Sequence, residues 1–493
     1  MRLLLIGLPT ALRDRVAAEL GRRHEVRDLT GDARNAADCE AAADCDVVIH
    51  GFEPGDDPVD DLDRASRSVW NVLTTTRASR YIQLSSMRIF TAYDPGWVVD
   101  ERWAPRPTTD PVDLAFYAAE ITSREVSRSR PVDCIVLRLD EVVPGAVFDA
   151  GPVQPRWLHI DDAVDAVVSA VDCARAPARW SPVHVVRGDD DARFTGTAAR
   201  GTPFEPTINH HSSGPARIAA PPVWPPTPRP IESVGAPTRI VIFGAGGPLA
   251  ATTAVQLRDG HVLRLTDVQP LAHFESAPPQ MVGAPRPTPP AAPHEERLVD
   301  VTDPAAVAAA MRGMDCVINC AVVRHDPVVA FRVNILGAYN TMRAAVDAGI
   351  PRVVHTGPVL TLAPHPVGYV ADRAVPDSAP PRPGEDVYFV TKLVAQEICR
   401  IFAEEHSLPC PILLFCGFVG PDPRGQGQPG PFTVSWDDAG RAMAAAAHVT
   451  SLPEPAPILH VLADSPHDKY TNTAAKSVLG WEPKDRLDHL WQR

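Results

Sequence analysis

The sequence predicts an α/β protein made of two tandem doubly wound parallel-sheet (Rossmann-like) domains. With 493 residues, the chain is about three times the usual domain size, so more than one hydrophobic core is expected. Short apolar runs rich in β-branched residues alternate with longer segments of helical period, as in parallel sheets covered by helices. Similar sequence patterns also occur on both sides of a proline-rich segment.

The proline-rich segment defines the predicted domain boundaries. Residues 213–237 contain eight prolines, a composition that forms neither a helix nor a central strand and favours extended geometry. We therefore expect a first domain at 1–212, a linker at 213–237 and a second domain at 238–493. A second proline cluster, Ala277 to Pro293, lies between two strand-like runs and is expected to form a surface loop.

The two halves repeat each other at a constant spacing. His184-Val-Val and Phe194-Thr-Gly-Thr-Ala-Ala recur, 276 residues later, as His460-Val-Leu and Tyr470-Thr-Asn-Thr-Ala-Ala. A shared spacing over separate segments is poorly explained by chance, so we interpret the chain as a tandem duplication.

The second half shows the alternation of strands and helices most clearly. Strands are predicted at Arg239–Gly244, His261–Asp267, Arg297–Val301, Cys316–Ala321, Arg352–Thr356 and Pro411–Phe415. Helices are predicted at Leu249–Arg258, Pro304–Arg312, Pro327–Ala348 and Asp386–His406. The first half follows the same order but is shorter at its start.

Composition argues against several classes of function. The formal charge of −14 lacks the basic excess that nucleic acid or anionic lipid requires. No apolar run approaches the roughly 20 residues of a membrane helix, and the opening run is too short for a signal peptide. The nine cysteines show no metal-ligand spacing, so we expect reduced core thiols, no metal and a cytoplasmic protein.

A glycine-rich turn between two predicted strands indicates dinucleotide binding. Gly244 permits a tight turn that includes Gly246, Gly247 lets a helix N-terminus approach a diphosphate, and Ala250 allows close helix packing. Asp267, at the end of the next strand, is placed to accept hydrogen bonds from the adenosine ribose. Because its carboxylate would repel a 2′-phosphate, NAD is favoured over NADP.

The second half resembles the extended short-chain dehydrogenase/reductase superfamily, specifically the NAD-dependent epimerase/dehydratase family, and the resemblance covers nearly all of both halves outside the linker. It rests on Gly244, Gly247, Ala250, Asp300, Asn334, Gly337, Tyr388 and Lys392. The resemblance implies that Tyr388 is the general acid/base. It also implies that Lys392, on the same helix face, lowers the phenol pKa and binds the nicotinamide ribose.

The third catalytic group of that family is a serine or threonine hydroxyl, and the second half of this sequence lacks it at the expected position. Pro358 stands at its position in the second half, which leaves Thr356 or Thr361 as substitutes. The first half keeps the hydroxyl at Ser86 and the phenol at Tyr117, but Ile121 replaces the lysine.

The start of the first half also differs from that of the second. Its turn has one glycine, Gly7, followed by the bulky Arg13. Its Gly7-to-Asp32 segment spans 25 residues, whereas Gly244 to Asp300 spans 56, so a strand–helix unit is expected to be absent. We interpret the first half as a degenerate copy.

These observations predict an NAD-dependent oxidoreductase or epimerase/dehydratase whose second half acts on a sugar-like, possibly nucleotide-activated substrate. The alternative is a non-catalytic NAD-binding pseudoenzyme that acts as a sensor or scaffold. The wide apolar stripe of the Tyr388 helix further predicts that the halves pair as an intrachain pseudo-dimer in a monomeric chain. The alternative arrangement is two loosely tethered domains, each of which packs its helix pair against another chain.

Overall fold

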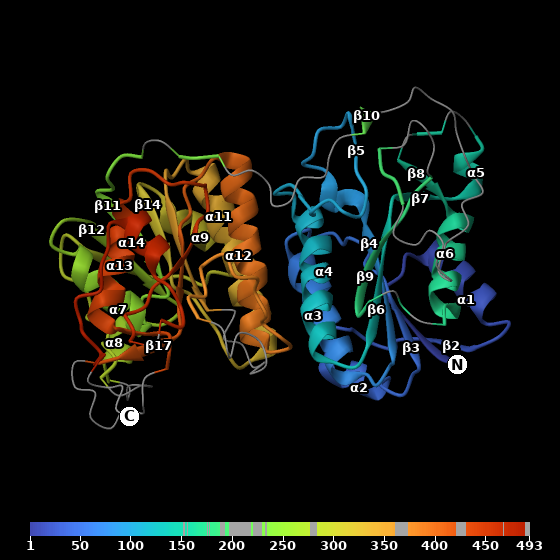
Figure 1. The fold of residues 1–493 in the computed structure, drawn as a ribbon, viewed down its shortest axis with the longest axis horizontal. Coiled ribbons are helices and arrows are strands. Elements are labelled where there is room, and N and C mark those ends of the chain that lie inside the picture. The colour runs from blue at the N-terminus through green and yellow to red at the C-terminus, as the bar shows by residue number, and fades with distance from the viewer. Residues whose placement is uncertain are drawn as a thin grey trace. The chain divides into compact units, whose positions relative to one another are not determined.

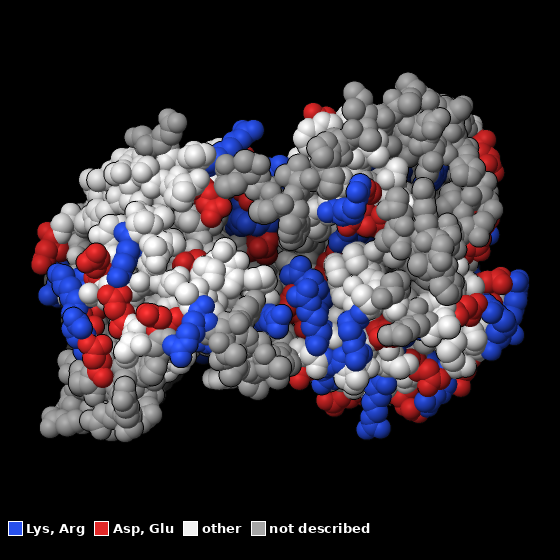
Figure 2. Space-filling view, in the orientation of Figure 1, with Lys and Arg blue, Asp and Glu red and all other residues white. Residues whose placement is uncertain are grey.

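The computed structural model divides the chain into two compact units, Met1–Thr227 and Pro228–Arg493 (Figure 1). It describes residues 1–150, 153–154, 156–174, 176, 178–187, 193–196, 218–219, 229–231, 234–276, 283–359, 373–420, 430–466 and 468–488. Within these ranges, no helix is both long and apolar enough to cross a membrane. On the face drawn in Figure 2, basic and acidic side chains are interspersed over both units.

The second unit is a seven-stranded sheet of order β13-β12-β11-β14-β15-β16-β19, in which every pairing is parallel. Helices α7 and α13 pack together and α9, α11 and α12 form a second group, so the predicted doubly wound α/β class is confirmed. The sheet strands are β11 (Arg239–Phe243), β12 (Val262–Asp267), β13 (Glu295–Leu298), β14 (Cys316–Asn319), β15 (Val353–Pro358), β16 (Ile412–Phe415) and β19 (Ile458–His460).

The helices of this unit include all the predicted regions, of which one is not continuous. They are α7 (Pro248–Leu257), α8 (Leu271–Ser276), α9 (Pro304–Met311), α10 (Pro327–Ala330), α11 (Gly337–Asp347), α12 (Val387–His406), α13 (Trp436–His448) and α14 (Thr473–Leu479), with a short pair β17 (Gly417–Val419) and β18 (Thr433–Ser435). The single helix predicted at Pro327–Ala348 is instead interrupted by a π-helical turn, Phe331–Leu336. Such turns are rare in proteins overall, but those that occur often lie at functional sites.

One predicted strand is displaced. The sequence places it at Arg297–Val301, whereas β13 ends at Leu298. The reason is Asp300, whose Oδ1 accepts the Thr302 backbone N–H at 2.8 Å and turns the chain before helix α9 begins.

The first unit is a six-stranded parallel sheet of order β2-β1-β3-β4-β6-β9. Its elements are β1 (Arg2–Ile6), α1 (Thr10–Leu20), β2 (Glu25–Asp28), α2 (Ala36–Ala41), β3 (Val47–His50), α3 (Asp60–Thr75), β4 (Arg80–Ser86), a 3₁₀ turn (Met87–Phe90), β5 (Trp97–Val98), α4 (Pro111–Ser129), β6 (Asp133–Leu139), β7 (Glu141–Val143), α5 (Gly145–Phe148), β8 (Trp157–His159), α6 (Ile160–Asp172), β9 (Trp180–Val185) and β10 (Ile218–Ala219). The sheet ends at β2, whereas in the second unit β13 follows the equivalent strand, as the shorter opening segment predicts.

The two units share long-range contacts at the same 276-residue spacing as their sequences. Val99 bridges Phe194 in the first unit, and Val375 bridges Tyr470 in the second. The His184 Nδ1 lies 3.1 Å from the Thr195 carbonyl, and the same contact recurs at 3.2 Å between His460 and Thr471. The rings therefore occupy corresponding places in the two folds.

Parts of the predicted linker pair with the unit nearest to them. Strand β10 pairs in parallel with β5, and Ile231 bridges Leu452 in antiparallel fashion. The Val234 N–H donates to the Thr450 carbonyl at 2.9 Å. Residues 220–228, between these contacts, lie outside the described residues, as do residues 277–282 of the second proline cluster.

Candidate cofactor and active site

The turn after β11 requires glycine at two positions. Gly244 has a φ of +72°, and a Cβ built there would lie 2.7 Å from the Ala321 backbone nitrogen. A Cβ on Gly246 would lie 2.5 Å from the ring of Phe274, which comes from α8. The close approach of two other segments therefore explains both glycines. Phe274 is a contact that the sequence alone does not reveal.

Helix α7 begins directly after this turn with its N-terminus uncapped by a side chain. Gly247 is the N-cap residue, Pro248 occupies the first helical position, and Ala250 is 1% exposed in the core. The first backbone N–H groups of a helix have no partner within it, and the helix dipole adds positive potential there. This N-terminus is therefore suited to an anionic group such as a diphosphate.

Asp267, at the end of β12, closes the turn. Its Oδ2 accepts the Gly246 N–H at 2.9 Å and its Oδ1 accepts the Val268 N–H at 2.8 Å. Burial raises the pKa of Asp267, while these backbone hydrogen bonds act in the opposite direction. The carboxylate thus braces the glycine turn. Asp300, which also carries the family resemblance and is predicted to contact the cofactor, holds the turn described above through its Oδ1.

Tyr388 lies near the start of α12, close to a cation from another segment. The Asp386 carboxylate caps the helix by accepting the Tyr388 and Phe389 N–H groups at 2.9 and 3.2 Å. The Arg324 guanidinium lies 5.3 Å from the centre of the half-buried Tyr388 ring. Burial raises the pKa of Tyr388, and Arg324 opposes that rise by its charge and a hydrogen bond.

Lys392, one helical turn later, is 2% exposed. Its Nζ lies 3.4 Å from Nε2 of His355, on β15, and burial lowers the pKa of Lys392 to about 8. His355 is itself 1% exposed, and its Nδ1 is buried without a hydrogen-bond partner in the described part of the chain. His355 and Arg324 were not predicted as site residues, because neither is adjacent to the helix in sequence.

The candidate hydroxyl of Thr356 points toward the neighbouring strand. Its Oγ1 donates to the Asn319 carbonyl at 2.9 Å, and the side chain is 8% exposed. Pro358, at the family's hydroxyl position, is buried at the end of β15, and Thr361 lies outside the described residues. The Thr356 hydroxyl therefore donates its hydrogen to the main chain and not to a substrate.

Asn334, in the π-helical turn, ties three segments together. Its side-chain amide donates to the Thr391 hydroxyl on α12 and to the Val323 carbonyl, each at 2.8 Å, and its Oδ1 accepts the Val323 N–H at 3.1 Å. Val323 precedes Arg324, so Asn334 fixes the segment that brings the guanidinium to Tyr388.

The corresponding turn in the first unit is filled by its own residues. Gly7 keeps a φ of +59°, but Leu8 packs into the core and Pro9 is the N-cap of α1. Since Leu5 pairs with Asp28 while Phe243 pairs with Thr266, the register places Thr30 opposite Gly7, where Asp267 lies opposite Gly244. Among the residues that the structure describes, no carboxylate closes this turn.

The remaining first-unit positions are also occupied differently. The Ser86 Oγ accepts the Arg88 N–H at 3.2 Å as a helix cap. Ile121, four residues after Tyr117, is 1% exposed. All nine cysteines are free, and among the described residues no group of three or more His, Cys, Asp or Glu side chains could hold a metal ion.

This combination of a doubly wound parallel sheet, a glycine turn and an uncapped helix defines the second unit as a dinucleotide-binding type of α/β domain. Residues 240–436, all within that unit, match the model of the NAD dependent epimerase/dehydratase family.

Parts of the chain are also similar to individual proteins. The chain is 30% identical over 182 residues to the L-arabinose 1-dehydrogenase (NAD(P)(+)) of Haloferax volcanii, which corresponds to 34% of this chain and 63% of that relative. Among solved structures, the uronate dehydrogenase of Agrobacterium tumefaciens aligns with 22% identity and a TM-score of 0.40, over 50% of this chain and 85% of that one. The glucuronic acid dehydrogenase of Chromohalobacter salexigens aligns with 20% identity and a TM-score of 0.40, also over 50% and 85%.

Proposed function

We propose that the second unit is an NAD-dependent oxidoreductase, of the dehydrogenase or epimerase/dehydratase type, that acts on a hydroxyl group of a sugar-like substrate. The observation that carries this proposal is Lys392. A lysine that is 2% exposed, four residues after Tyr388, costs folding free energy, and among the described residues it has no carboxylate partner. Perturbed, buried cations of this kind concentrate at functional sites.

The residues of the glycine turn fit the dinucleotide that the family match implies. A side chain at Gly244 or Gly246 would collide with its neighbours, and the α7 N-terminus has no side-chain cap. Gly247 and the N-terminus of α7 would hold the diphosphate, with Ala250 allowing close packing of that helix, and Asp267 and Asp300 would face the adenosine half. Bound NAD would supply the hydride acceptor. The Asp267 carboxylate favours NAD over NADP by repelling a 2′-phosphate.

Tyr388 exchanges the substrate proton in this proposal. Its phenolate must form at moderate pH, although burial raises the pKa of Tyr388. The positive charge of Arg324 stabilises the phenolate, which makes the phenol a better base toward a substrate hydroxyl. The charge of Lys392, one helical turn later, would add to this effect. Lys392 would in addition donate to the nicotinamide ribose.

The two candidate functions differ in whether they need a third catalytic hydroxyl group. A catalytic site uses such a hydroxyl to bind the reacting oxygen, whereas a protein that only binds NAD does not need one. Thr356 is the described candidate, but its hydrogen is donated to Asn319 and Pro358 stands at the family position. This observation favours the second candidate function, an NAD-binding pseudoenzyme that senses cofactor or holds a partner. Under the catalytic proposal, Tyr388, aided by Arg324, activates the substrate without a strong third donor.

The proposed substrate class is a neutral or nucleotide-activated sugar. The Haloferax volcanii relative is described as an L-arabinose 1-dehydrogenase, and this chain spans 63% of its length. Purified protein incubated with NAD and a panel of sugars and sugar nucleotides tests both candidates. NADH formation supports a dehydrogenase, and conversion of a sugar to an epimer or a dehydrated product without net NADH supports an epimerase or dehydratase. Saturable NAD binding without conversion of any sugar supports the pseudoenzyme.

We also propose that the chain arose by tandem duplication and that the first unit is degenerate for cofactor binding. The contacts shared at a 276-residue spacing support the duplication. Leu8, Pro9 and Thr30 support the loss of a cofactor turn.

The proposed intrachain pseudo-dimer has a direct test. Residues 229–493 retain the pairing of Ile231 with Leu452. If the two units share an apolar helix face, this fragment should dimerise or aggregate, while the full chain should be monomeric by light scattering. A stable monomeric fragment would refute the pairing.

A further inference from the structure

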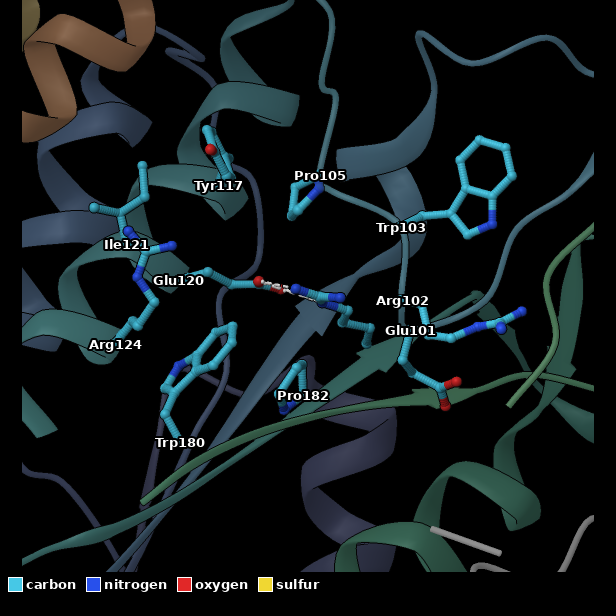
Figure 3. A pocket seen from close by; sticks show the side chains of 11 residues that line it. Glu101, Arg102, Trp103, Pro105, Tyr117, Glu120, Ile121, Arg124, Trp180 and Pro182 are labelled. Atoms are coloured by element: carbon cyan, nitrogen blue, oxygen red, sulfur yellow. Dashed lines mark hydrogen bonds and ion pairs between the residues drawn. The ribbon is translucent and has the colours of Figure 1, made fainter. Parts of the chain in front are cut away.

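The first unit contains a cleft of about 330 Å³ that the proposed function does not use (Figure 3). It lies between helix α4, strands β6 and β9, and the segment Glu101–Pro105. Side chains of Tyr117, Ile121, Trp180, Pro105 and Pro182 surround a central ion pair in the view. Ligand pockets typically combine such apolar walls with a few fixed polar groups.

The central ion pair joins Glu120 of α4 to Arg138 of β6. Both side chains are 2% exposed, and the guanidinium Nε and Nη2 donate to the two carboxylate oxygens at 3.0 and 2.7 Å. A paired geometry of this kind holds both groups rigidly, while a carboxylate retains further lone pairs for a ligand hydroxyl. The cleft therefore offers a fixed, charge-assisted hydrogen-bonding group between apolar walls.

The other two arginines of the lining are also paired with carboxylates. Arg124 donates to Glu125 at 2.6 Å, and Arg102 donates to Asp100 at 2.6 Å. An anionic ligand such as a phosphate or a carboxylate would have to compete with these partners. The charge balance therefore favours a neutral ligand over a nucleotide.

The walls favour a ligand with one apolar face. The Trp180 indole N–H donates to the Ser123 hydroxyl on α4 at 3.3 Å, which fixes the ring edge beside the cleft. The Arg138 guanidinium lies 5.9 Å from the Trp180 ring centre, so ring and ion pair are neighbours. A pyranose or furanose ring presents C–H groups to an indole and hydroxyls to a carboxylate–guanidinium pair.

We propose that this cleft binds a neutral monosaccharide. Its volume is at the lower end of the range for ligand pockets, which suits one sugar ring and excludes a whole sugar nucleotide. Because Ile121 replaces the lysine that would assist Tyr117, the site binds the sugar without oxidising it. The proposal rests on the cleft alone and is independent of catalysis in the second unit.

The test is calorimetric titration of the full chain, without NAD, with L-arabinose, D-galactose and D-glucose. At least one should bind saturably. Trp180→Ala should weaken that binding about tenfold or more, and Trp180→Phe should retain most of it. Trp157→Ala, at a half-exposed tryptophan on β8 outside the cleft, is the matched control and should bind as the wild type does.

Two further variants distinguish sugar binding in the cleft from cofactor binding and turnover in the second unit. Gly247→Arg, which blocks the cofactor turn, should leave the sugar titration unchanged, so loss of turnover and loss of cleft binding are distinguishable. Arg124→Ala, at the rim, serves if Trp180→Ala does not fold, and should weaken binding by a smaller factor. The absence of saturable binding, equal binding by Trp180→Ala, or binding of sugar nucleotides alone would overturn the proposal.

Discussion

The helices that carry Tyr388 and Tyr117 in the two units differ at one buried position. Lys392 lies four residues after Tyr388 in α12, and Ile121 lies four residues after Tyr117 in α4. Both side chains are almost completely buried, at 2% and 1% exposure. A fold that accommodates isoleucine at this position does not need a cation there. The lysine is therefore best explained by chemistry rather than by stability.

The two nucleotide turns show the same contrast. In the second unit, glycines leave the α7 N-terminus accessible and Asp267 braces the turn through the Gly246 N–H. In the first unit, Leu8 fills the core and Pro9 has no N–H to offer an acid. Apolar packing in place of open backbone is what we expect of a turn that no longer receives an anion.

The sharpest test of this contrast is to remove each phenol in turn. Tyr388→Phe should lower turnover by about 10²- to 10⁴-fold, because the phenol transfers the substrate proton, and should leave NAD affinity nearly intact. Steady-state kinetics and NAD titration measure the two effects. Tyr117→Phe is the matched control and should leave turnover unchanged. The reverse result would place the chemistry in the first unit.

A block of one glycine turn should remove cofactor binding altogether. Gly247→Arg places a large side chain at the N-cap of α7, so NAD binding should weaken by about 100-fold or more. Calorimetry of the wild type should give one site per chain. Two sites per chain, or unchanged binding by the variant, would contradict the assignment of the cofactor to the second unit alone.

Replacing the buried lysine by the isoleucine of the first unit should raise stability and lower activity. Lys392→Ile copies the first unit, and should abolish most turnover while stabilising the NAD-free protein. A lysine whose pKa falls from 10.5 to about 8 on burial costs about 3 kcal/mol at neutral pH. Denaturant unfolding of the two proteins measures the difference.

The same pair of proteins should differ in pH dependence. The unfolded chain binds a proton at Lys392 up to a pH of about 10.5, whereas the folded chain releases it above about 8. Stability therefore rises with pH between these values, and the advantage of Lys392→Ile should shrink across that window. A constant difference from pH 7 to 10 would mean that Lys392 is not desolvated.

The smallest effect is expected at Asp267. Asp267→Ala removes the carboxylate that disfavours a 2′-phosphate, so the ratio of NAD to NADP affinity should fall by about tenfold. The variant also loses the acceptor of the Gly246 N–H, and NAD binding itself should weaken. Titration with both cofactors measures the ratio, and Asp267→Asn, which retains an acceptor for that N–H, separates charge from turn geometry.

The sequence by itself determined the fold class, the glycine turn, the spacing of Tyr388 and Lys392, and the shorter opening of the first unit. Each of these depends on local period, on turn chemistry or on the spacing of residues along the chain, which a sequence carries directly. The early end of β13 was not predicted, because it follows from a local turn in which Asp300 accepts the Thr302 N–H. The π-helical turn at Asn334 was not predicted, because it contains a tertiary hydrogen bond from Asn334 to Thr391.

Only the tertiary structure decided which side chains are neighbours across elements. Arg324 beside Tyr388, His355 beside Lys392 and the Glu120–Arg138 pair each join residues from separate strands, helices or loops. Such pairs depend on strand register and helix placement, and shifting either by one residue would turn the side chains elsewhere. Local patterns place a residue on an element, but packing of the whole domain chooses its partner.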